Sequence, residues 1–235
     1  MAQLFAGTSG FAYASWKPRF YPSDLPTKKF LEYYARQLNS VEINYTFRRL
    51  PAASTLEAWI QATPPGFLFS VKAHMRITHI LRLKNAADFT ELFLRSMDPL
   101  RAARRLGPIL FQLPPYFHCD LGVLGDFLAG LPEGLRFAFE FRHASWLDDS
   151  VYDLLAQRNV ALCWAESEKF EVPAKLTADF VYFRLRKVKY SAKDRQAISR
   201  TAKKLLAGGK DVFVFFKHED TPEGALYAKE LLTLP

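Results

Sequence analysis

The chain has 235 residues, of which 49% are hydrophobic, and a formal net charge of +8. This length and apolar content allow a buried core in one large domain or two small ones, and no apolar run is long enough for a transmembrane helix. The N-terminus lacks the basic and apolar regions of a signal peptide, and the two cysteines, Cys119 and Cys163, have no metal-binding spacing. We therefore expect a protein of the reducing cytoplasm.

Short apolar segments recur along the chain, and each is followed by a polar loop. Their β-branched and aromatic residues, often in period-two alternation, predict strands. Eight such strands are expected, at residues 4–9, 40–47, 68–73, 108–113, 136–142, 160–167, 180–186 and 211–217.

Segments between these strands have the apolar spacing of amphipathic helices. Thr27 is expected to cap the first helix, and Ser54 with Glu57 has the spacing of a capping box at the second. The expected helices cover residues 27–38, 54–62, 86–105 (one or two helices), 121–130, 149–158, 191–207, 222–232 and, with the least regular pattern, 168–178.

Strands that alternate with helices predict parallel βαβ units. A closed (β/α)₈ barrel and an open doubly wound sheet both fit this order, and the count of eight strands and the chain length favour the barrel. No G-x-G-x-x-G segment follows a strand, which removes the main motif of a dinucleotide-binding sheet. We therefore expect a single-domain TIM-type barrel with parallel strands over residues 1–235.

The strand expected at 136–142 carries charges within an apolar segment. Phe137, Phe139 and Phe141 share one face, whereas Glu140 and Arg142 share the other. Buried charges need partners, and in a barrel the second face points into the interior and the mouth. The same alternation on other strands brings a polar set together: Glu42, Asn44, Lys72, Gln112, Glu140, Arg142 and Arg184.

Two interpretations fit this polar set. It can brace the interior of the barrel as a satisfied polar layer, or it can form a pocket at the C-terminal mouth. Because five strands share the pattern near their C-terminal ends, we favour the pocket.

Several long motifs, in order, resemble the YecE-like family, also called domain of unknown function 72. The resemblance runs essentially end to end and implies a TIM-type barrel, but no assigned activity. The motifs are GTSGF (7–11) with Trp16 and FYP (20–22), VEINYTFRRLP (41–51), FLFSVKA (67–73) with ITH (77–79), LGPILFQLPP (106–115), EFRHASW (140–146) and DFVYFRLR (179–186). The family's polar positions fall on Glu42, Asn44, Lys72, His79, Gln112, Glu140, Arg142 and His143.

The chain departs from the common family pattern after three strands. Glu166-Ser167 stands in place of Asp-Ser, and Arg186-Lys187 in place of His-Gly. The segment 217–220 replaces a segment that is often rich in Asn. These changes make the expected mouth more basic and leave the roles of the three loops open.

The residue types favour an anion pocket. Lys72, Arg142 and Arg184, joined by Arg186 at the mouth, supply positive charge, and arginine can bind phosphate or carboxylate through two nitrogens. Asn44 and Gln112 are expected to orient the ligand. Glu42 or Glu140 is the candidate general acid or base, and His79 or His143 can share that role. For each histidine the alternative is a loop residue with a backbone hydrogen bond.

Two other active-site types fit the sequence less well than the anion pocket. Glu42, Glu140 and a histidine can form a divalent-metal site, but three nearby cations oppose it, and no organic cofactor is expected. A retaining glycosidase needs two carboxylates about 5–5.5 Å apart, whereas Glu42 and Glu140 lie on strands expected to be far apart around the barrel.

Basic segments raise nucleic acid as a second kind of partner. They are 101–105, 184–190 and 201–210, of which 184–190 lies at the expected mouth and contains aromatic residues. Trp16, with Phe11 and Tyr13, can stack on a base or sugar, or can roof the barrel by packing. We thus expect an enzyme that acts by acid/base chemistry on a phosphorylated or other anionic substrate, or on nucleic acid. The alternative is a non-catalytic binding or sensing protein, and neither a membrane nor a protein partner is evident.

Overall fold

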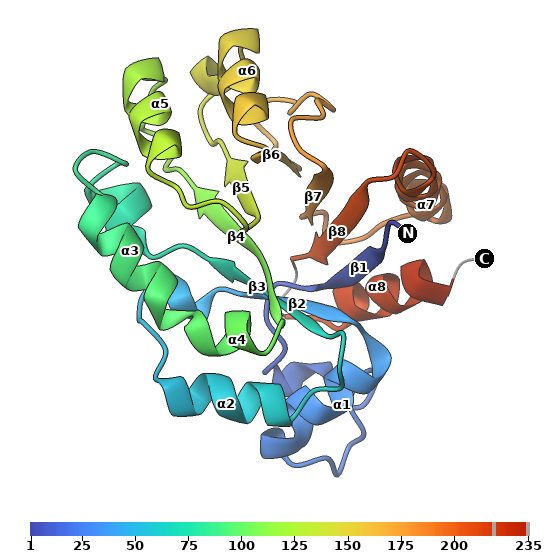
Figure 1. The fold of residues 1–235 in the computed structure, drawn as a ribbon. Coiled ribbons are helices and arrows are strands. Elements are labelled where there is room, and N and C mark those ends of the chain that lie inside the picture. Colours follow the sequence, from blue (N-terminus) through green and yellow to red (C-terminus); the bar gives the residue numbers. More distant parts are fainter. Residues whose placement is uncertain (218–219, 234–235) are drawn as a thin grey trace.

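The computed structural model describes residues 1–217 and 220–233. Eight parallel strands form one sheet in the order β1-β8-β7-β6-β5-β4-β3-β2, which curves into a near-closed barrel (Figure 1). This arrangement confirms the predicted TIM-type α/β barrel and excludes the open doubly wound sheet. The strands are β1 Leu4–Thr8, β2 Ser40–Ile43, β3 Leu68–Lys72, β4 Leu106–Gln112, β5 Phe137–Glu140, β6 Ala161–Ala165, β7 Phe180–Leu185 and β8 Asp211–Phe216.

The helices surround the strands, and seven of the expected helical segments are found where the sequence predicts them, with 86–105 split in two. Within the described part of the chain, no helix has both the length and the apolar character needed to cross a membrane. The helices are α1 Phe30–Gln37, α2 Ala53–Gln61, α3 Ala87–Ser96, α4 Asp98–Ala102, α5 Leu121–Ala129, α6 Asp149–Gln157, α7 Ala192–Ala207 and α8 Glu223–Thr233.

The helix predicted at 168–178 is wrong. Residues 166–179 connect β6 to β7 as a loop without helix or strand. Pro173 lies in the middle of the segment, where it removes a backbone donor and opposes a helical turn. The barrel therefore lacks one of its outer helices.

The predicted helix caps are also wrong. Thr27 lies inside the 3-10 turn Thr27–Lys29, and α2 begins before Ser54 with no capping side chain. The capping box occurs instead at α7, where the side chains of Ser191 and Asp194 each accept a backbone N–H of the other residue.

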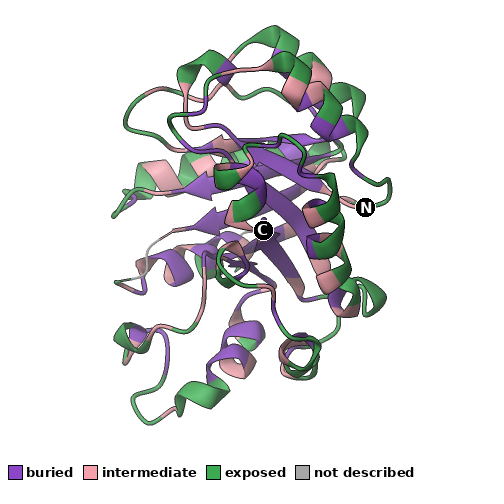
Figure 2. Cartoon of the chain, turned by 90° about the vertical axis from the view of Figure 1, so that its left-hand side faces the viewer, coloured by how far each residue is buried: buried purple, intermediate pink, exposed green. Residues whose placement is uncertain are grey.

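The alternation within the strands separates two cores, and Figure 2 shows the strands buried along their length beneath helices with exposed outer faces. Phe137, Phe139 and Phe141 are buried between sheet and helices, as predicted. Inside the barrel the lower layer is also aromatic: the rings of Phe5 and Phe213 stack with centroids 4.7 Å apart. Polar side chains on the inner face therefore lie above an apolar floor.

Side chains join β1 to β2, where the described residues share one backbone bridge, between Ser9 and Glu42. The Asn39 amide accepts from the Ala6 N–H at 2.9 Å and donates to the Leu4 carbonyl at 2.8 Å. The Tyr34 hydroxyl accepts from the Thr8 N–H at 2.8 Å and lies 3.1 Å from the Ser40 carbonyl oxygen, to which it donates. The hydrogen bonds of Asn39 and Tyr34 therefore take the place of part of the backbone ladder between β1 and β2.

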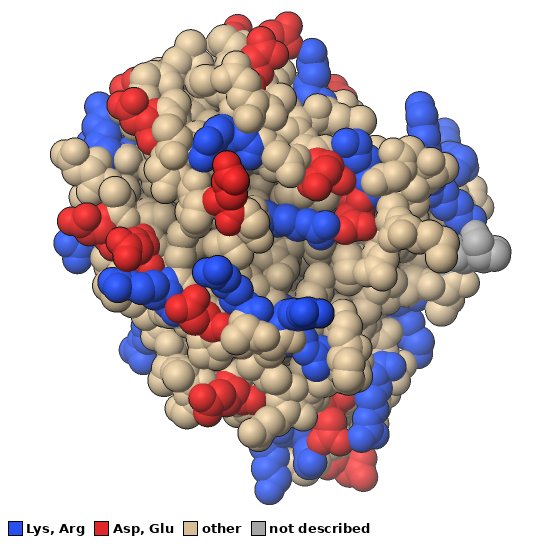
Figure 3. Space-filling view, in the orientation of Figure 1, with Lys and Arg blue, Asp and Glu red and all other residues tan. Residues whose placement is uncertain are grey.

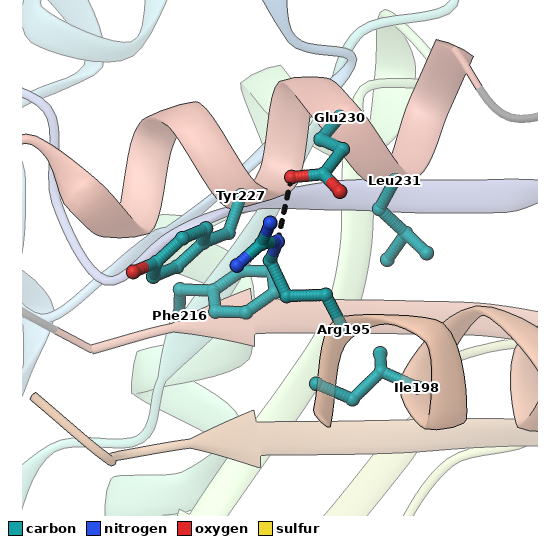
Figure 4. A pocket seen from close by; sticks show the side chains of 6 residues that line it. All are labelled: Arg195, Ile198, Phe216, Tyr227, Glu230 and Leu231. Carbon is teal, nitrogen blue, oxygen red and sulfur yellow. Dashed lines mark ion pairs between the residues drawn. The ribbon is translucent and has the colours of Figure 1, made fainter. Parts of the chain in front are cut away.

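An ion pair and an aromatic cluster fasten α7 to α8 over the outer face of β8 (Figure 4). Arg195 Nε lies 2.8 Å from Glu230 Oε2, and its guanidinium lies 5.3 Å from the centroid of the Tyr227 ring. The Tyr227 ring packs against Phe216, the last residue of β8, at a centroid distance of 5.9 Å. This cluster holds the outer layer together and lies on the helix side of the sheet.

The close approach at the β1–β2 junction requires glycine at position 7. A Cβ added to Gly7 would lie 1.9 Å from the Ser40 carbonyl oxygen, which belongs to the backbone and cannot rotate away. We expect Gly7→Ala to lower the free energy of unfolding by about 2 kcal/mol or more, because overpacking forces β1 away from β2. Chemical denaturation measures this change.

Gly125→Ala is the matched control. Gly125 lies in the middle of α5, and a Cβ there would meet no atom within 4 Å. Alanine at this position should leave stability unchanged or raise it by up to about 1 kcal/mol. A Gly7→Ala protein as stable as the wild type would contradict the close contact.

Candidate functional site

The inner faces of β2, β5 and β7 meet at a single guanidinium. Arg184 on β7 donates from Nη2 to Glu42 Oε1 at 2.7 Å and from Nη1 to Glu140 Oε2 at 2.5 Å. Its side chain is 1% exposed, and both carboxylates are fully buried. The structure therefore brings these residues together, as predicted. The sequence suggested that the two carboxylates lie far apart, whereas both of them bind the same guanidinium.

Glu42 receives further hydrogen bonds. Ser9 Oγ donates to its Oε1 at 2.7 Å, and the Tyr182 hydroxyl donates to its Oε2 at 2.8 Å. Burial alone would raise the pKa of Glu42, but the charge and hydrogen bonds of Arg184, with those of Ser9 and Tyr182, outweigh it and hold the pKa below its ordinary value. Glu42 is therefore an ionised, fully engaged group beneath the mouth.

Glu140 anchors two more arginines at the mouth. Its Oε1 accepts from Arg142 Nη1 at 3.0 Å and from Arg186 Nη2 at 2.6 Å. Burial alone would raise the pKa of Glu140. The positive charges of Arg184, Arg186 and Arg142, in decreasing order of effect, outweigh burial and lower the pKa to about 2. The side chains of Arg186 and Arg142 are 18% and 31% exposed, so they lie between the buried carboxylate and the outside.

Lys72, at the end of β3, lies beside this network. Its Nζ donates to Gln112 Oε1 at 2.9 Å and lies 4.1 Å from the centroid of the Phe47 ring. Burial, and after it the charge of Arg184, lowers the pKa of Lys72 to about 8. Gln112 Oε1 also accepts from Arg184 Nη1 at 3.3 Å, which ties the lysine to the buried cluster.

A π-helical turn, Arg76–Ile80, follows β3 and carries His79 to the mouth. The His79 ring packs edge-on against Phe47 at a centroid distance of 5.0 Å, and its Nδ1 shares a hydrogen bond with Thr78 Oγ1. Burial, followed by the charges of Lys72 and Arg142, lowers the pKa of His79. The structure therefore brings His79 next to the cationic cluster.

The second strand ends earlier than predicted. Asn44 has helical backbone angles, φ −93° and ψ −13°, and starts the 3-10 turn Tyr45–Phe47. The alternation therefore stops, Phe47 reaches Lys72, and Tyr45 is 50% exposed. Among the described residues, the buried Asn44 Oδ1 has no hydrogen-bond partner.

Two predicted residues, Trp16 and His143, make contacts outside the cluster. Trp16 is fully buried and stacks on Tyr21 at a centroid distance of 5.9 Å, so its indole packs in the roof beside β1. His143 Nδ1 accepts from the Ser145 N–H at 3.1 Å and caps the short turn after β5, and its ring lies 3.9 Å from that of His118. These placements match the packing and backbone-bonded alternatives given above for each residue.

A cleft of about 950 Å³ opens beside the arginines, and its lining includes Arg142, Arg186 and Lys187. Figure 3 shows Lys and Arg side chains bordering a hollow near the centre of one face, with Asp and Glu side chains among them. Glu166 Oε2 in the cleft wall accepts from the backbone N–H groups of Arg186 and Lys187 and so fixes the turn after β7. His218 and Glu219, part of the changed family segment, lie outside the described residues.

The donor set around the cluster does not resemble a metal site. Within the described ranges, no three His, Cys, Asp or Glu side chains come close enough to hold an ion. The oxygens of Glu42 and Glu140 already receive arginine, serine and tyrosine donors, and neither side chain is exposed. Their closeness therefore does not form the open carboxylate pair of a retaining glycosidase.

Ser9, Phe47 and Tyr182 are members of the cluster that the sequence did not single out. Tyr182 lies two residues before Arg184 on β7, so its side chain points to the same inner face. The alternation along the strand could therefore have predicted its place in the cluster. Ser9 and Phe47 contact the cluster only because of the β1–β2 bridge and the early end of β2. No local pattern predicts either contact.

The pKa of Glu140 makes stability depend on pH. A glutamate titrates near 4.3 in an unfolded chain and Glu140 near 2 in the fold, so its contribution is complete above about pH 4.3 and is lost as the pH falls toward 2. We expect Glu140→Gln to lower the free energy of unfolding at neutral pH by about 3–5 kcal/mol, because Arg184 loses a charged partner. The variant should also weaken the acid dependence, as measured by denaturation between these pH values.

Glu57→Gln, on the exposed face of α2, is the control and should behave like the wild type. An unchanged acid dependence in Glu140→Gln would show that this carboxylate is not the group whose charge stabilises the barrel.

Sequence comparisons identify relatives of the chain. A family model described as "Protein of unknown function DUF72" matches residues 5–234. The UPF0759 protein YecE of Escherichia coli K12 is 37% identical over 114 residues, which make up 48% of this chain and 41% of YecE. YunF of Bacillus subtilis is 27% identical over 157 residues, 63% of this chain and 54% of YunF. The matches thus span about half the length of these curated relatives.

Solved structures agree with the family match. A crystal structure of a DUF72 family protein from Thermotoga maritima has a TM-score of 0.87 and 26% identity, and the match covers 98% of both chains. Another, from Enterococcus faecalis, has a TM-score of 0.77 and 21% identity and covers 100% of this chain and 99% of that one. Since the family model matches nearly every residue, this chain belongs to the DUF72 family of proteins of unknown function.

Proposed function

We propose that this barrel is an enzyme that binds a phosphorylated or other anionic substrate at the mouth next to Glu140. The position of two arginines at the cleft carries the proposal. Arg142 and Arg186 line the cleft, are partly exposed, and are both held by Glu140 Oε1. Guanidinium groups held in this way suit the binding of an anion.

The cations have different roles in this proposal. Arg184 is buried and links the carboxylates of Glu42 and Glu140. Arg142 and Arg186 are partly exposed, and one carboxylate oxygen holds both, so their guanidinium groups are positioned before the ligand arrives. They form the anion clamp, and Asn44, which follows β2, is the proposed group that orients the ligand.

Proton transfer in the proposal falls to Lys72 and His79. The sequence favoured Glu42 and Glu140 as acid and base, but both are buried, ionised and occupied by donors, which suits them to position the arginines. Lys72 has a pKa of about 8, so its protonated and neutral forms are both populated near neutral pH. The lowered pKa of His79 keeps that ring neutral and able to accept a proton.

The alternative is a non-catalytic protein that senses an anion with the same clamp. A permanently charged lysine would serve such a protein better, because a partly neutral amine weakens anion binding. The observation that favours an enzyme is that two titratable groups, Lys72 and His79, both pack against Phe47 beside the anion clamp and have lowered pKa values.

Nucleic acid is a second candidate ligand because three loops at the mouth contain Lys and Arg but neither Asp nor Glu. These loops, 44–52, 73–86 and 186–191, follow β2, β3 and β7 and carry Arg48, Arg49, Arg76, Arg82, Lys84, Arg186, Lys187 and Lys189. Tyr45 and Tyr116, in the loops after β2 and β4, are 50% and 60% exposed. Exposed aromatic rings among cations suit a single strand, whose bases stack and whose phosphates pair with charge.

The anion clamp is tested with inorganic phosphate by calorimetry at low ionic strength. We expect Arg142→Ala to weaken phosphate binding about tenfold or more, because a charge-assisted hydrogen bond is lost. Arg200→Ala, which removes an exposed charge from α7, should bind phosphate like the wild type. Equal affinities of wild type and Arg142→Ala would place phosphate elsewhere, and an absence of binding by the wild type would overturn the proposal.

The nucleic-acid candidate is tested by anisotropy of a short labelled single strand over a range of salt concentrations. The double variant Arg48→Ala/Arg49→Ala should reduce the slope of log affinity against log salt by about 1.4, which is two phosphate contacts. Tyr116→Ala should weaken binding about tenfold through lost stacking.

The double variant Lys203→Ala/Lys204→Ala removes the same charge from an exposed part of α7 and is the matched control. Equal losses in both double variants would indicate binding by general surface charge and would remove nucleic acid as a ligand of the mouth.

A further inference from the structure

The ring of helices is open between α6 and α7, where Figure 1 shows the loop 166–179 in place of a helix. Trp164, Phe183 and Leu185 point outward from β6 and β7, the side that helices cover elsewhere in the barrel. The Trp164 ring is only partly buried and packs edge-on against Phe183 at a centroid distance of 5.0 Å. The loop therefore leaves part of an aromatic wall accessible.

The cleft described above extends along this opening. Its lining includes the aromatic side chains of Trp164, Phe170 and Phe183 together with Arg142 and Arg186. Its volume, about 950 Å³, is at the upper end of the range for small-molecule sites. One ligand can therefore touch both the aromatic wall and the anion clamp.

The loop side of the cleft adds hydrogen-bond acceptors. Glu168 and Glu171 are exposed and line the cleft with Phe170. These carboxylates can accept from the N–H groups of a flat ring, and Lys169, which lies between them in the sequence, also lines the cleft. Aromatic surface, acceptors and a pair of arginines together match a molecule with a ring at one end and an anion at the other.

We propose that the cleft binds a nucleoside phosphate, with the base against Trp164 and Phe170 and the phosphate at Arg142 and Arg186. This inference rests on the proposed anion clamp and adds the chemical class of the substrate. The aromatic wall is available because the barrel lacks the helix after β6. Specificity for the base thus comes from the outer side of β6 and β7, and the phosphate is held at the mouth.

The test compares each of AMP, GMP, CMP and UMP with ribose 5-phosphate, which has the same phosphate and sugar but no base. We expect at least one nucleotide to bind about tenfold tighter than ribose 5-phosphate, because stacking adds to the clamp. Trp164→Leu and Phe170→Ser should abolish this difference and leave the affinity for ribose 5-phosphate unchanged. Arg142→Ala should weaken both kinds of ligand.

Trp59→Leu is the matched control, since Trp59 is also half-buried and stacks on Phe69 with centroids 5.7 Å apart, but it lies on α2. It should keep the preference for the nucleotide. If ribose 5-phosphate binds through Arg142 and no nucleotide binds more tightly, the inference is overturned and the anion clamp stands. If the wild type binds none of these ligands, the clamp falls with it.

Discussion

The barrel interior depends on one buried guanidinium between two carboxylates. Removing arginine and glutamate charges from water costs several kcal/mol for each ion, and close pairing with good hydrogen bonding offsets that cost. Arg184 pairs through both Nη atoms with Glu42 and Glu140, which come from strands on other parts of the barrel, whereas its buried Nε has no hydrogen-bond partner among the described residues. The same contact that satisfies these charges therefore fixes the positions of β2, β5 and β7 relative to one another.

The side chains of the cluster show a gradient of exposure from the interior to the mouth. Going outward, Arg184, Arg186 and Arg142 are 1%, 18% and 31% exposed, and all three contact Glu140. Beneath them lies an aromatic layer that includes Phe5 and Phe213. The buried polar layer therefore continues outward, through Arg186 and Arg142, into the lining of the cleft.

Much of the fold, but less of the site, follows from local sequence. Alternation placed Phe139 outside and Glu140 inside because strand geometry makes that choice residue by residue. The early end of β2, before Asn44, could not be predicted, because it depends on a helical backbone conformation that a residue between Ile43 and Tyr45 need not adopt. The contacts of Glu42 with Ser9 and Tyr182 depend on barrel closure, which brings together residues 33 and 140 positions apart.

The seam between β1 and β2 also has a consequence for the order of folding. The backbone ladder of β1 is made with β8, so Phe5 pairs with Phe213 across almost the whole chain, whereas its sequence neighbour β2 is reached mainly through side chains. Such distant pairing raises the contact order and delays closure until the last strand is available. In a circular permutant that begins at β2 and carries β1 after β8, the pairing of β1 with β8 would be local in the sequence. The contact between Ser9 and Glu42 would then join the two ends of the chain and would be the late event that completes the charged cluster.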